Sequence, residues 1–221
     1  MKRVIVISFA VLLSLSGVVQ ASSGAGFKWS RATLEAIAKG DAERGKKVAK
    51  EHNCKKCHGE TGISDEDDTP SIAGQVPSYH FKQLMEYKHE VREEKTMTKR
   101  ARKLSQQDMA DLAAWYAKQK PEPRAGTKIR LAIPKLVTHG DPKRLLLPCN
   151  VCHGKDGEGM GVQVPALSGQ KIEAFVDTMT YFRDGDREND EYGRMRFIAQ
   201  QLTEEEIEQL AKYYGAKPSD D

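Results

Sequence analysis

The sequence has only four cysteines, and none of them lies outside two short motifs. After residue 19 it has no apolar run of the about 20 residues that a transmembrane helix needs, and it has no long low-complexity tract. Neither sign of charge is in large excess, since the formal net charge of the 221 residues is +3. With 38% hydrophobic and 30% charged residues, these absences exclude a polytopic membrane protein and favour a soluble globular one, for which we expect no nucleic-acid partner.

The N-terminus has the pattern of an export signal. Two cations precede an apolar run of 16 residues, 4–19, and Val19-Gln20-Ala21 fits the small-residue pattern of a signal-peptidase site. We therefore expect cleavage near Ala21, a mature protein that begins near Ser22, and a periplasmic location. An uncleaved N-terminal anchor is the alternative, although the run is shorter than a typical membrane span.

The four cysteines lie in two copies of the pattern CxxCH, at Cys54, Cys57 and His58 and at Cys149, Cys152 and His153. Three interpretations compete: two disulfides, a four-cysteine metal site and two c-type haem attachment sites. A zinc ribbon places its CxxC pairs about 15 to 20 residues apart, whereas 91 residues separate the two pairs here. A thioredoxin-like redox pair expects a βαβ setting and gives the histidine no role.

The haem interpretation uses every residue of the motif. Two thiols bond covalently to the haem, and the adjacent imidazole is delivered to the iron as its proximal ligand. Export agrees with it, since c-type attachment is completed outside the cytoplasm. We therefore predict two covalently attached c-type haems, each with its iron.

The two halves of the chain repeat one another. A shift of 95 residues places Cys57 on Cys152, and it places the segment PSIAGQ at 70–75 on the segment PALSGQ at 165–170. The second half is therefore a copy of the first, and residues with a role in one half should have a counterpart in the other.

Each half also has one methionine in a matching position. Beyond a three-residue insertion, a shift of 98 places residues 97–117 on 195–215, so Met97 falls on Met195. An N-cap signature, LSQQD or LTEEE, follows each of them and begins the last helix. A methionine thioether opposite histidine leaves iron no open position, so we predict that both are iron ligands carried on loops. Met179 instead belongs to a stripe at helical spacing that we expect to be buried, with Ile172, Phe175, Val176 and Phe182.

The pattern predicts helices and no convincing strands, so we expect an all-α fold. In the first half the expected helices span residues 41–53, 75–89 and 105–120. The second half has a shorter lead-in, because Pro142 and Pro148 leave little room for a first helix. The chain then divides into signal peptide, N-terminal extension, first domain, linker and second domain, at residues 1–21, 22–40, 41–120, 121–138 and 139–221.

Four histidines outside the motifs have no counterpart in the other half: His52, His80, His89 and His139. We interpret each of them as an exposed or locally hydrogen-bonded side chain.

These motifs identify a family resemblance: two CxxCH sites, each followed by a P…GQ segment, a methionine and a final helix that ends in WYA or YYG. The chain resembles the di-haem class I cytochromes c of the cytochrome c4 type over essentially its whole mature length. The resemblance implies two tandem class I cytochrome c domains, each around one covalently bound haem. It implies attachment and iron ligation by Cys54 and Cys57 with His58 and Met97, and by Cys149 and Cys152 with His153 and Met195. It also implies that the carbonyls of Pro70 and Pro165 accept hydrogen bonds from the proximal histidines.

The function that follows is a periplasmic electron-transfer protein that shuttles electrons between a donor and an acceptor protein, such as a dehydrogenase or an oxidase, near the membrane surface. It has no substrate chemistry of its own. The alternative is a cytochrome subunit of a permanent dehydrogenase complex that oxidises a sulfur compound or an alcohol. A di-haem peroxidase would need one iron without a sixth side-chain ligand, and the two matched methionines argue against it.

Charge is distributed unevenly between the halves. Residues 41–120 carry 16 basic and 14 acidic side chains, a net charge of +2, whereas residues 139–221 carry 10 and 16, a net charge of −6. Cations flank Met97, and acidic residues precede Met195. We therefore expect an acidic partner at the first domain and a more basic partner at the second, with solvated surfaces as the alternative.

Overall fold

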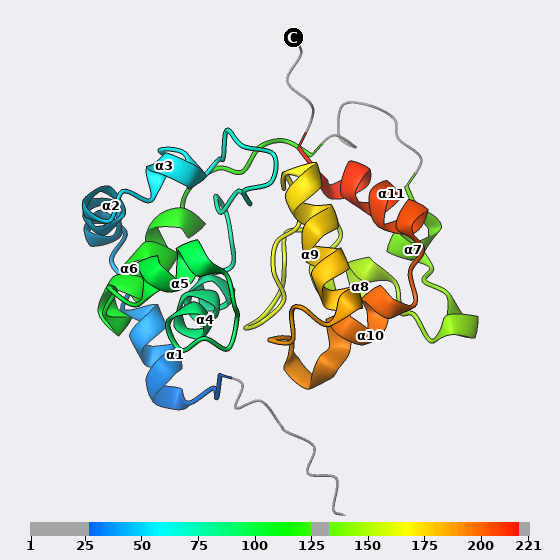
Figure 1. The fold of residues 1–221 in the computed structure, drawn as a ribbon, viewed down its shortest axis with the longest axis horizontal. Coiled ribbons are helices and arrows are strands. Elements are labelled where there is room, and N and C mark those ends of the chain that lie inside the picture. The colour runs from blue at the N-terminus through cyan, green and yellow to red at the C-terminus, as the bar shows by residue number, and fades with distance from the viewer. Residues whose placement is uncertain (1–26, 125–132, 217–221) are drawn as a thin grey trace, which may run out of the picture.

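The computed structural model describes residues 27–124 and 133–216, and the predicted signal peptide lies outside these residues. Every regular element in the described residues is a helix, and none is long and apolar enough to cross a membrane. The helices form two lobes that lie side by side (Figure 1). The first lobe contains α1 Arg31–Ala38, α2 Ala42–Glu51, α3 Lys55–His58, α4 Pro77–Lys88, α5 Lys95–Ala101 and α6 Gln106–Ala117. The second contains α7 Lys135–Thr138, η2 Pro142–Arg144, α8 Cys149–His153, α9 Ile172–Asp184, η3 Glu191–Gly193, α10 Arg194–Gln200 and α11 Glu204–Tyr214.

The last helix of each lobe begins at the predicted N-cap. The Ser105 hydroxyl accepts a hydrogen bond from the backbone N–H of Asp108, and the Asp108 carboxylate accepts one from the Ser105 N–H. Thr203 and Glu206 make the same capping box at α11. Each box satisfies N–H groups that have no partner inside the helix, and this fixes where α6 and α11 start.

The buried apolar residues form two clusters, one in each lobe. The first includes Phe81, Met109 and Tyr116, and the second includes Ile207 and Tyr214. The predicted stripe on α9 is confirmed: Phe175, Met179 and Phe182 are buried in the second cluster, with Ile172 and Val176 packed against it. A fully buried side chain of this size stabilises the fold by about 1.5 to 3 kcal/mol, so each lobe has a core of its own.

The N-terminal extension packs on the first lobe. The ring of Phe27 makes edge contacts with Trp29 and Phe81, at centroid distances of 4.9 and 6.0 Å, and Ile37 of α1 packs against the same core. Ser30 caps α1 by accepting a hydrogen bond from the N–H of Thr33. The extension therefore adds a helix to the first lobe, and the described residues of the second lobe contain no equivalent of it.

The predicted linker, 121–138, includes part of the second lobe. Leu136 and Val137 of α7 are buried in the second core cluster, although the proline-rich sequence before them indicates a linker. Part of this segment, 125–132, lies outside the described residues. We propose that the second domain begins at about Lys135.

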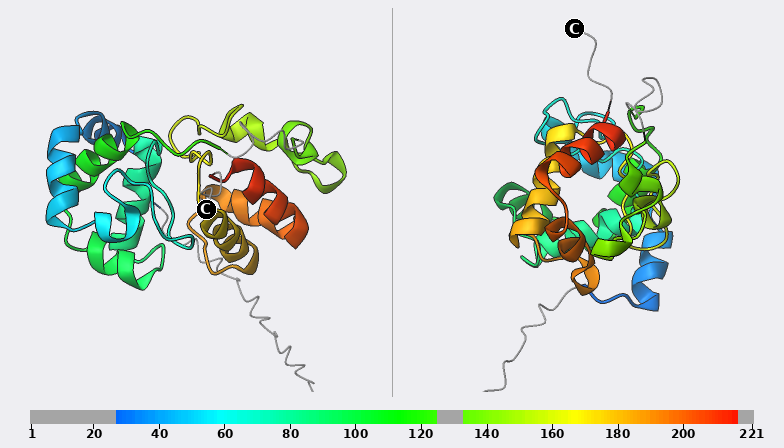
Figure 2. Two further views of the ribbon diagram at one scale, coloured as in Figure 1. Left: turned by 90° about the horizontal axis from the view of Figure 1, so that it is seen from above. Right: turned by 90° about the vertical axis from the view of Figure 1, so that its right-hand side faces the viewer.

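Two glutamines join the lobes, and they occupy matching positions in the repeat. The Gln75 amide accepts a hydrogen bond from the N–H of Ala166 at 2.9 Å and donates one to its carbonyl at 3.1 Å. The Gln170 amide makes the same pair of bonds with Ser71, at 2.7 and 2.9 Å. Since Ala166 is the counterpart of Ser71, the two halves meet about an approximate two-fold axis. Figure 2 shows the lobes from above, joined by the segments between them.

A largely buried polar cluster, here called the interface cluster, extends this contact. Its residues are Tyr79, Lys82, Gln83, Glu86 and Arg92 from the first lobe and Arg187 and Asn189 from the second. The Asn189 amide donates to both Gln83 and Glu86, at 2.9 and 2.7 Å. Three of these side chains are cations and only Glu86 is an anion, so the cluster has a surplus of two positive charges.

We predict that Gln170→Ala destabilises the contact between the lobes. The substitution leaves the N–H and carbonyl of Ser71 without their partner, and a buried unsatisfied polar group costs about 1 to 3 kcal/mol. Urea unfolding of the haem-loaded protein should show a loss of this size. Gln200→Ala, at an exposed position on α10, is the control and should change stability by less than about 0.5 kcal/mol. Equal effects of the two substitutions would contradict the assignment.

Candidate haem sites

The histidine of each motif is held by a proline carbonyl twelve residues further along the chain. His58 Nδ1 lies 3.0 Å from the Pro70 oxygen, and His153 Nδ1 lies 3.0 Å from the Pro165 oxygen. Because a carbonyl only accepts, Nδ1 carries the proton in both rings, and Nε2 keeps its lone pair. Burial lowers the pKa of both histidines, against the opposing effect of the carbonyl, so the rings are neutral. A neutral imidazole with a free Nε2 is a suitable iron ligand.

A glycine shapes the loop between histidine and proline in each half. Gly62 has a φ of +87° and Gly157 a φ of +76°, a region that favours glycine. A Cβ on either glycine would lie 2.7 Å from the ring of a tyrosine on the last helix, Tyr116 or Tyr214. These glycines allow the loop to approach the last helix closely enough to bring the proline carbonyl back to the histidine.

The cysteines do not form disulfides or a cluster of metal ligands. All four are free, and the described residues contain no group of three or more histidine, cysteine or acidic side chains placed to hold a metal ion. Burial raises the pKa of the Cys54 thiol and raises that of Cys149 to about 11. A redox-active CxxC pair depends on a lowered thiol pKa, so these thiols do not resemble a thioredoxin-like pair.

The two methionines are on short helices, and the prediction that loops carry them is wrong. Met97 lies in α5, because the Glu94 carboxylate caps this helix by accepting hydrogen bonds from the N–H groups of Thr96 and Met97. Met195 lies in α10, where Asp190 accepts from the N–H of Arg196. An acidic N-cap, Glu94, is the sequence signal for α5. The N-cap of α10 is Gly193, which has no side chain to cap the helix.

Each methionine packs against the same core cluster as the first cysteine of its half. Met97 and Cys54 are partly buried against the first cluster, and Met195 and Cys149 against the second. The structure therefore brings the two ends of each predicted ligand set to one core.

The interface cluster supplies positive charge that suits a haem. Arg92 and Arg187 are counterparts in the repeat, and both donate to the same oxygen of Gln83, at 2.7 and 3.1 Å. Burial, and then the charge of Arg187, lowers the pKa of Arg92. Two cations that share one neutral acceptor favour a nearby anion, and a haem carries two carboxylates. The donor set and the surplus charge fit the predicted cofactor.

Sequence reasoning missed the position of His80. The interpretation of an exposed or locally hydrogen-bonded side chain is wrong, because His80 is 7% exposed on α4 and its Nδ1 has no hydrogen-bond partner. The repeat held a signal for this burial, since the counterpart of His80 is Phe175, a member of the stripe predicted to be buried.

The surfaces beside the two motifs differ. In the second lobe Val151 is 56% exposed and Met160 is 50% exposed, and both line an open groove of about 390 Å³ beside Cys152. The matching positions in the first lobe are Lys56 and Asp65, both exposed. The second attachment site is therefore bordered by apolar side chains and the first by charged ones.

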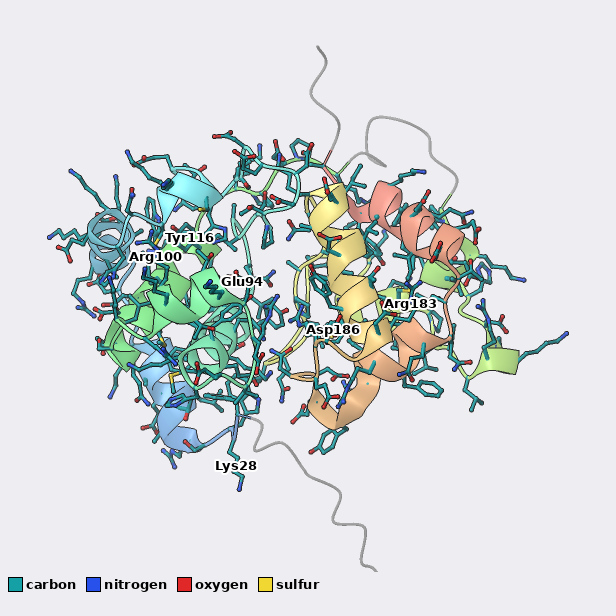
Figure 3. All side chains as sticks on the ribbon, viewed as in Figure 1. Lys28, Glu94, Arg100, Tyr116, Arg183 and Asp186 are labelled. Carbon is teal, nitrogen blue, oxygen red and sulfur yellow. The ribbon has the colours of Figure 1, made fainter. Side chains whose placement is uncertain are left out.

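The charges around the methionines are also paired differently. In the first lobe Lys95, Lys99, Arg100 and Lys103 are exposed around Met97. In the second, arginines neutralise much of the acidic segment: Arg183 pairs with Asp184, and Arg196 pairs with Glu188 and Asp190. Figure 3 shows Glu94 and Arg100 on the first lobe and Arg183 and Asp186 on the second. The expected acidic rim is thus weaker than the basic one.

Comparisons with known proteins agree with this architecture. The sequence model of the cytochrome c family matches residues 42–120. Cytochrome c4 from Thiocapsa roseopersicina is 37% identical over 164 residues, which are 72% of this chain and 84% of that protein. The crystal structure of reduced recombinant cytochrome c4 from Pseudomonas stutzeri matches with a TM-score of 0.71 and 32% identity, over 79% of this chain and 97% of that one.

A further relative has a different description. The thiosulfate dehydrogenase electron acceptor of Thiomonas intermedia (strain K12) is 28% identical over 171 residues, which are 75% of this chain and 79% of that protein.

We predict that Met97→Ala and Met195→Ala each open one iron to carbon monoxide, because each removes a predicted sixth ligand. Met179→Ala is the matched control, since this methionine is buried in the second core. It should cost about 2 to 5 kcal/mol of stability and leave the ligand-binding spectrum unchanged. Carbon monoxide binding by Met179→Ala, without binding by Met195→Ala, would show that the repeat alignment is wrong.

Proposed function

The chain belongs to the cytochrome c4 family of di-haem electron-transfer proteins, and we propose that it works in the periplasm as a carrier with no substrate chemistry of its own. It carries two covalently attached c-type haems. The observation that supports the proposal most directly is the repetition of one complete ligand set: a CxxCH motif, a neutral histidine held by a proline carbonyl, and a methionine on a short helix.

We assign the same roles to matching residues of the two halves. Cys54 and Cys57 attach the first haem and Cys149 and Cys152 the second, while His58 with Met97 and His153 with Met195 ligate the irons. The carbonyls of Pro70 and Pro165 orient the histidine rings. Each iron, when bound, takes up and releases one electron. With a histidine and a methionine both held to each iron, no position would remain for a substrate, and this supports a carrier over an enzyme.

The interface cluster has a role in holding the haems. Arg92, Arg187 and Tyr79 lie together where the lobes meet, with Arg187 donating to the Tyr79 hydroxyl at 2.9 Å. We assign these side chains to the haem carboxylates, whose charge would offset the surplus of the cluster. Both lobes contribute to the cluster, so the carboxylates would also hold the lobes together.

The first lobe suits an acidic redox partner. Lys95, Lys99, Arg100 and Lys103 are exposed, whereas Arg102 is paired with Glu90. Arg100 lies close enough to Cys54 to lower its pKa, against the larger effect of burial, so the basic surface borders the first haem site. Complementary charge raises the rate of encounter with a partner, and salt screens it.

The second lobe suits a redox partner with an uncharged, apolar contact surface. Residues 145–154 and 159–170 contain no acidic side chain, lysine or arginine, and Leu147, Val151 and Met160 within them are exposed. The short segment between them carries Lys155, Asp156 and Glu158, whose charges sum to −1. A partner that placed a charge against this surface would lose the hydration of that charge without gaining an ion pair. We therefore replace the expected basic partner with an uncharged one, whose binding should depend little on salt.

A permanent complex is the second candidate, because one relative is described as the electron acceptor of a thiosulfate dehydrogenase. Permanent interfaces are larger and more apolar than those of transient redox encounters, which tend to bury less than about 1,200 Å². If the chain is a fixed subunit, the native haem protein should elute from a sizing column with a stoichiometric dehydrogenase at both low and high salt. We expect it to elute alone at high salt.

The carrier proposal predicts a salt-dependent effect of charge reversal. Changing Lys99, Arg100 and Lys103 to Glu should slow electron exchange with an acidic partner about tenfold at low ionic strength, because steering is lost. The measurement is stopped-flow oxidation of the reduced protein by an acidic and by an uncharged redox protein, at several salt concentrations. Exchange with the uncharged protein should remain nearly unchanged.

The control for this experiment has the same change in net charge at a different surface. Lys28, Lys39 and Lys120 are exposed on the same lobe, and their change to Glu should leave the acidic partner's rate within about twofold of the native rate. Equal slowing by the two sets, or slowing that persists at high salt, contradicts docking at the basic surface.

A further inference from the structure

The aromatic position beside each haem site is polar in one lobe and apolar in the other. His80 on α4 and Phe175 on α9 are counterparts in the repeat, and each is 7% exposed. The His80 ring packs on Tyr116 at a centroid distance of 5.5 Å, and the Phe175 ring packs on Tyr214 at 6.2 Å. The two tyrosines are themselves counterparts, so the lobes differ here by one ring in an otherwise repeated arrangement.

Both rings lie next to the predicted haem ligands. The Tyr116 hydroxyl is hydrogen-bonded to the Cys54 thiol, which contributes to raising the pKa of this tyrosine after burial itself. His58 lies near enough to His80 to contribute, after burial itself, to lowering the pKa of His80, and Cys149 lies near enough to Tyr214 to contribute, after burial, to raising the pKa of Tyr214. A change of polarity at either ring therefore takes place within the surroundings of one iron.

His80 is not explained by packing alone. Its Nδ1 is buried without a hydrogen-bond partner, and such groups are rare in folded proteins because they lose their hydration without compensation. Burial lowers the pKa of His80 to about 3, so the ring is neutral. A phenyl ring fills the same position in the second lobe without an unpaired polar atom. The imidazole thus has a cost to stability, and a cost of this kind points to a function.

We propose, on the basis of the electron-transfer function above, that His80 lowers the reduction potential of the first haem relative to the value that a phenyl ring would give. The oxidised iron carries one more positive charge than the reduced iron. A polar ring in the pocket stabilises the more highly charged state, whereas an apolar ring disfavours it. Phe175 has the opposite effect on the second haem.

Net charge acts in the other direction, since the −6 of residues 139–221 stabilises an oxidised second haem. Exchange of the two rings separates the contributions, because it changes no formal charge. The difference between the two rings changes the difference between the two haem potentials, and so changes how an electron distributes between the haems. The two ligand sets are the same and do not by themselves produce such a difference.

The test is a reciprocal exchange in the haem-loaded protein, with both midpoint potentials measured by spectroelectrochemical titration. In His80→Phe we expect one midpoint potential to rise by about 28 to 59 mV. This corresponds to a change of about three- to tenfold in the equilibrium constant for reduction, at 59 mV per tenfold for one electron. In Phe175→His we expect the other potential to fall by a similar amount. Unchanged potentials in both variants, or shifts of the opposite sign, overturn the proposal.

Two further variants separate polarity from structure. His80→Asn keeps a polar side chain and should hold the potential near the native value, whereas His80→Leu should follow His80→Phe. If all of them lower the melting temperature and their potentials do not follow polarity, the role of His80 is structural and the proposal fails. The absorption band of the methionine–iron bond should persist in each variant, and its loss in His80→Phe would instead make His80 a support of ligation and overturn the proposal.

Failure of the electron-transfer function gives a different result. The potentials are measured at an electrode without a partner protein. If the chain exchanges no electrons with redox proteins, the carrier function is contradicted, but the potentials of the His80 and Phe175 variants still test the effect of the two rings. If His80→Phe does not incorporate haem, Phe175→His decides the question, because it introduces the imidazole at the matching position of the second lobe.

Discussion

The hydrogen bond from the proximal histidine to a proline carbonyl is the interaction on which the rest of each half depends. It joins His58 to Pro70, places the proton on Nδ1 and leaves Nε2 free for its predicted role as an iron ligand. The loop between them closes only because Gly62 takes a positive φ and lets the Tyr116 ring approach. The last helix is placed by the same contact. One bond thereby links the cysteine motif, the loop and the helix that forms the core.

The second half keeps this frame and changes what surrounds it. His153 is held in the same way, at the same distance, but the surface beside its motif is apolar where that of the first half is charged. The interior differs as well, since Phe175 stands where the first half has a buried histidine. Repetition therefore preserves the hydrogen bond that holds each histidine, and the residues outside it give the two sites different surfaces and different interior surroundings.

The contact between the halves converts two similar domains into one carrier. Gln75 and Gln170 each bond to both the N–H and the carbonyl of a residue in the opposite lobe. A shift of one lobe along the other would leave these groups without partners, so the bonds fix the relative position of the lobes. The surplus positive charge nearby would be unfavourable without anions, so haem carboxylates bound there would make haem binding and lobe association depend on each other. Electrons entering one lobe can then leave from the other at a fixed separation.

The sequence by itself determined the haem chemistry, the repeat, the all-α class and the starts of the last helices, because these depend on residues close together in the chain or on the shift between copies. Only the tertiary structure decided that α5 carries Met97, that Leu136 belongs to the second core, that His80 is buried and that Gln75 reaches the other lobe. Three of these four depend on which surfaces come together in space, often from residues more than 60 positions apart. The helix at Met97 depends on a local cap, the Glu94 carboxylate, which accepts hydrogen bonds from the N–H groups of Thr96 and Met97. A sequence pattern shows how residues are spaced along the chain, whereas the burial of a side chain and its hydrogen-bond partners depend on how the whole molecule packs.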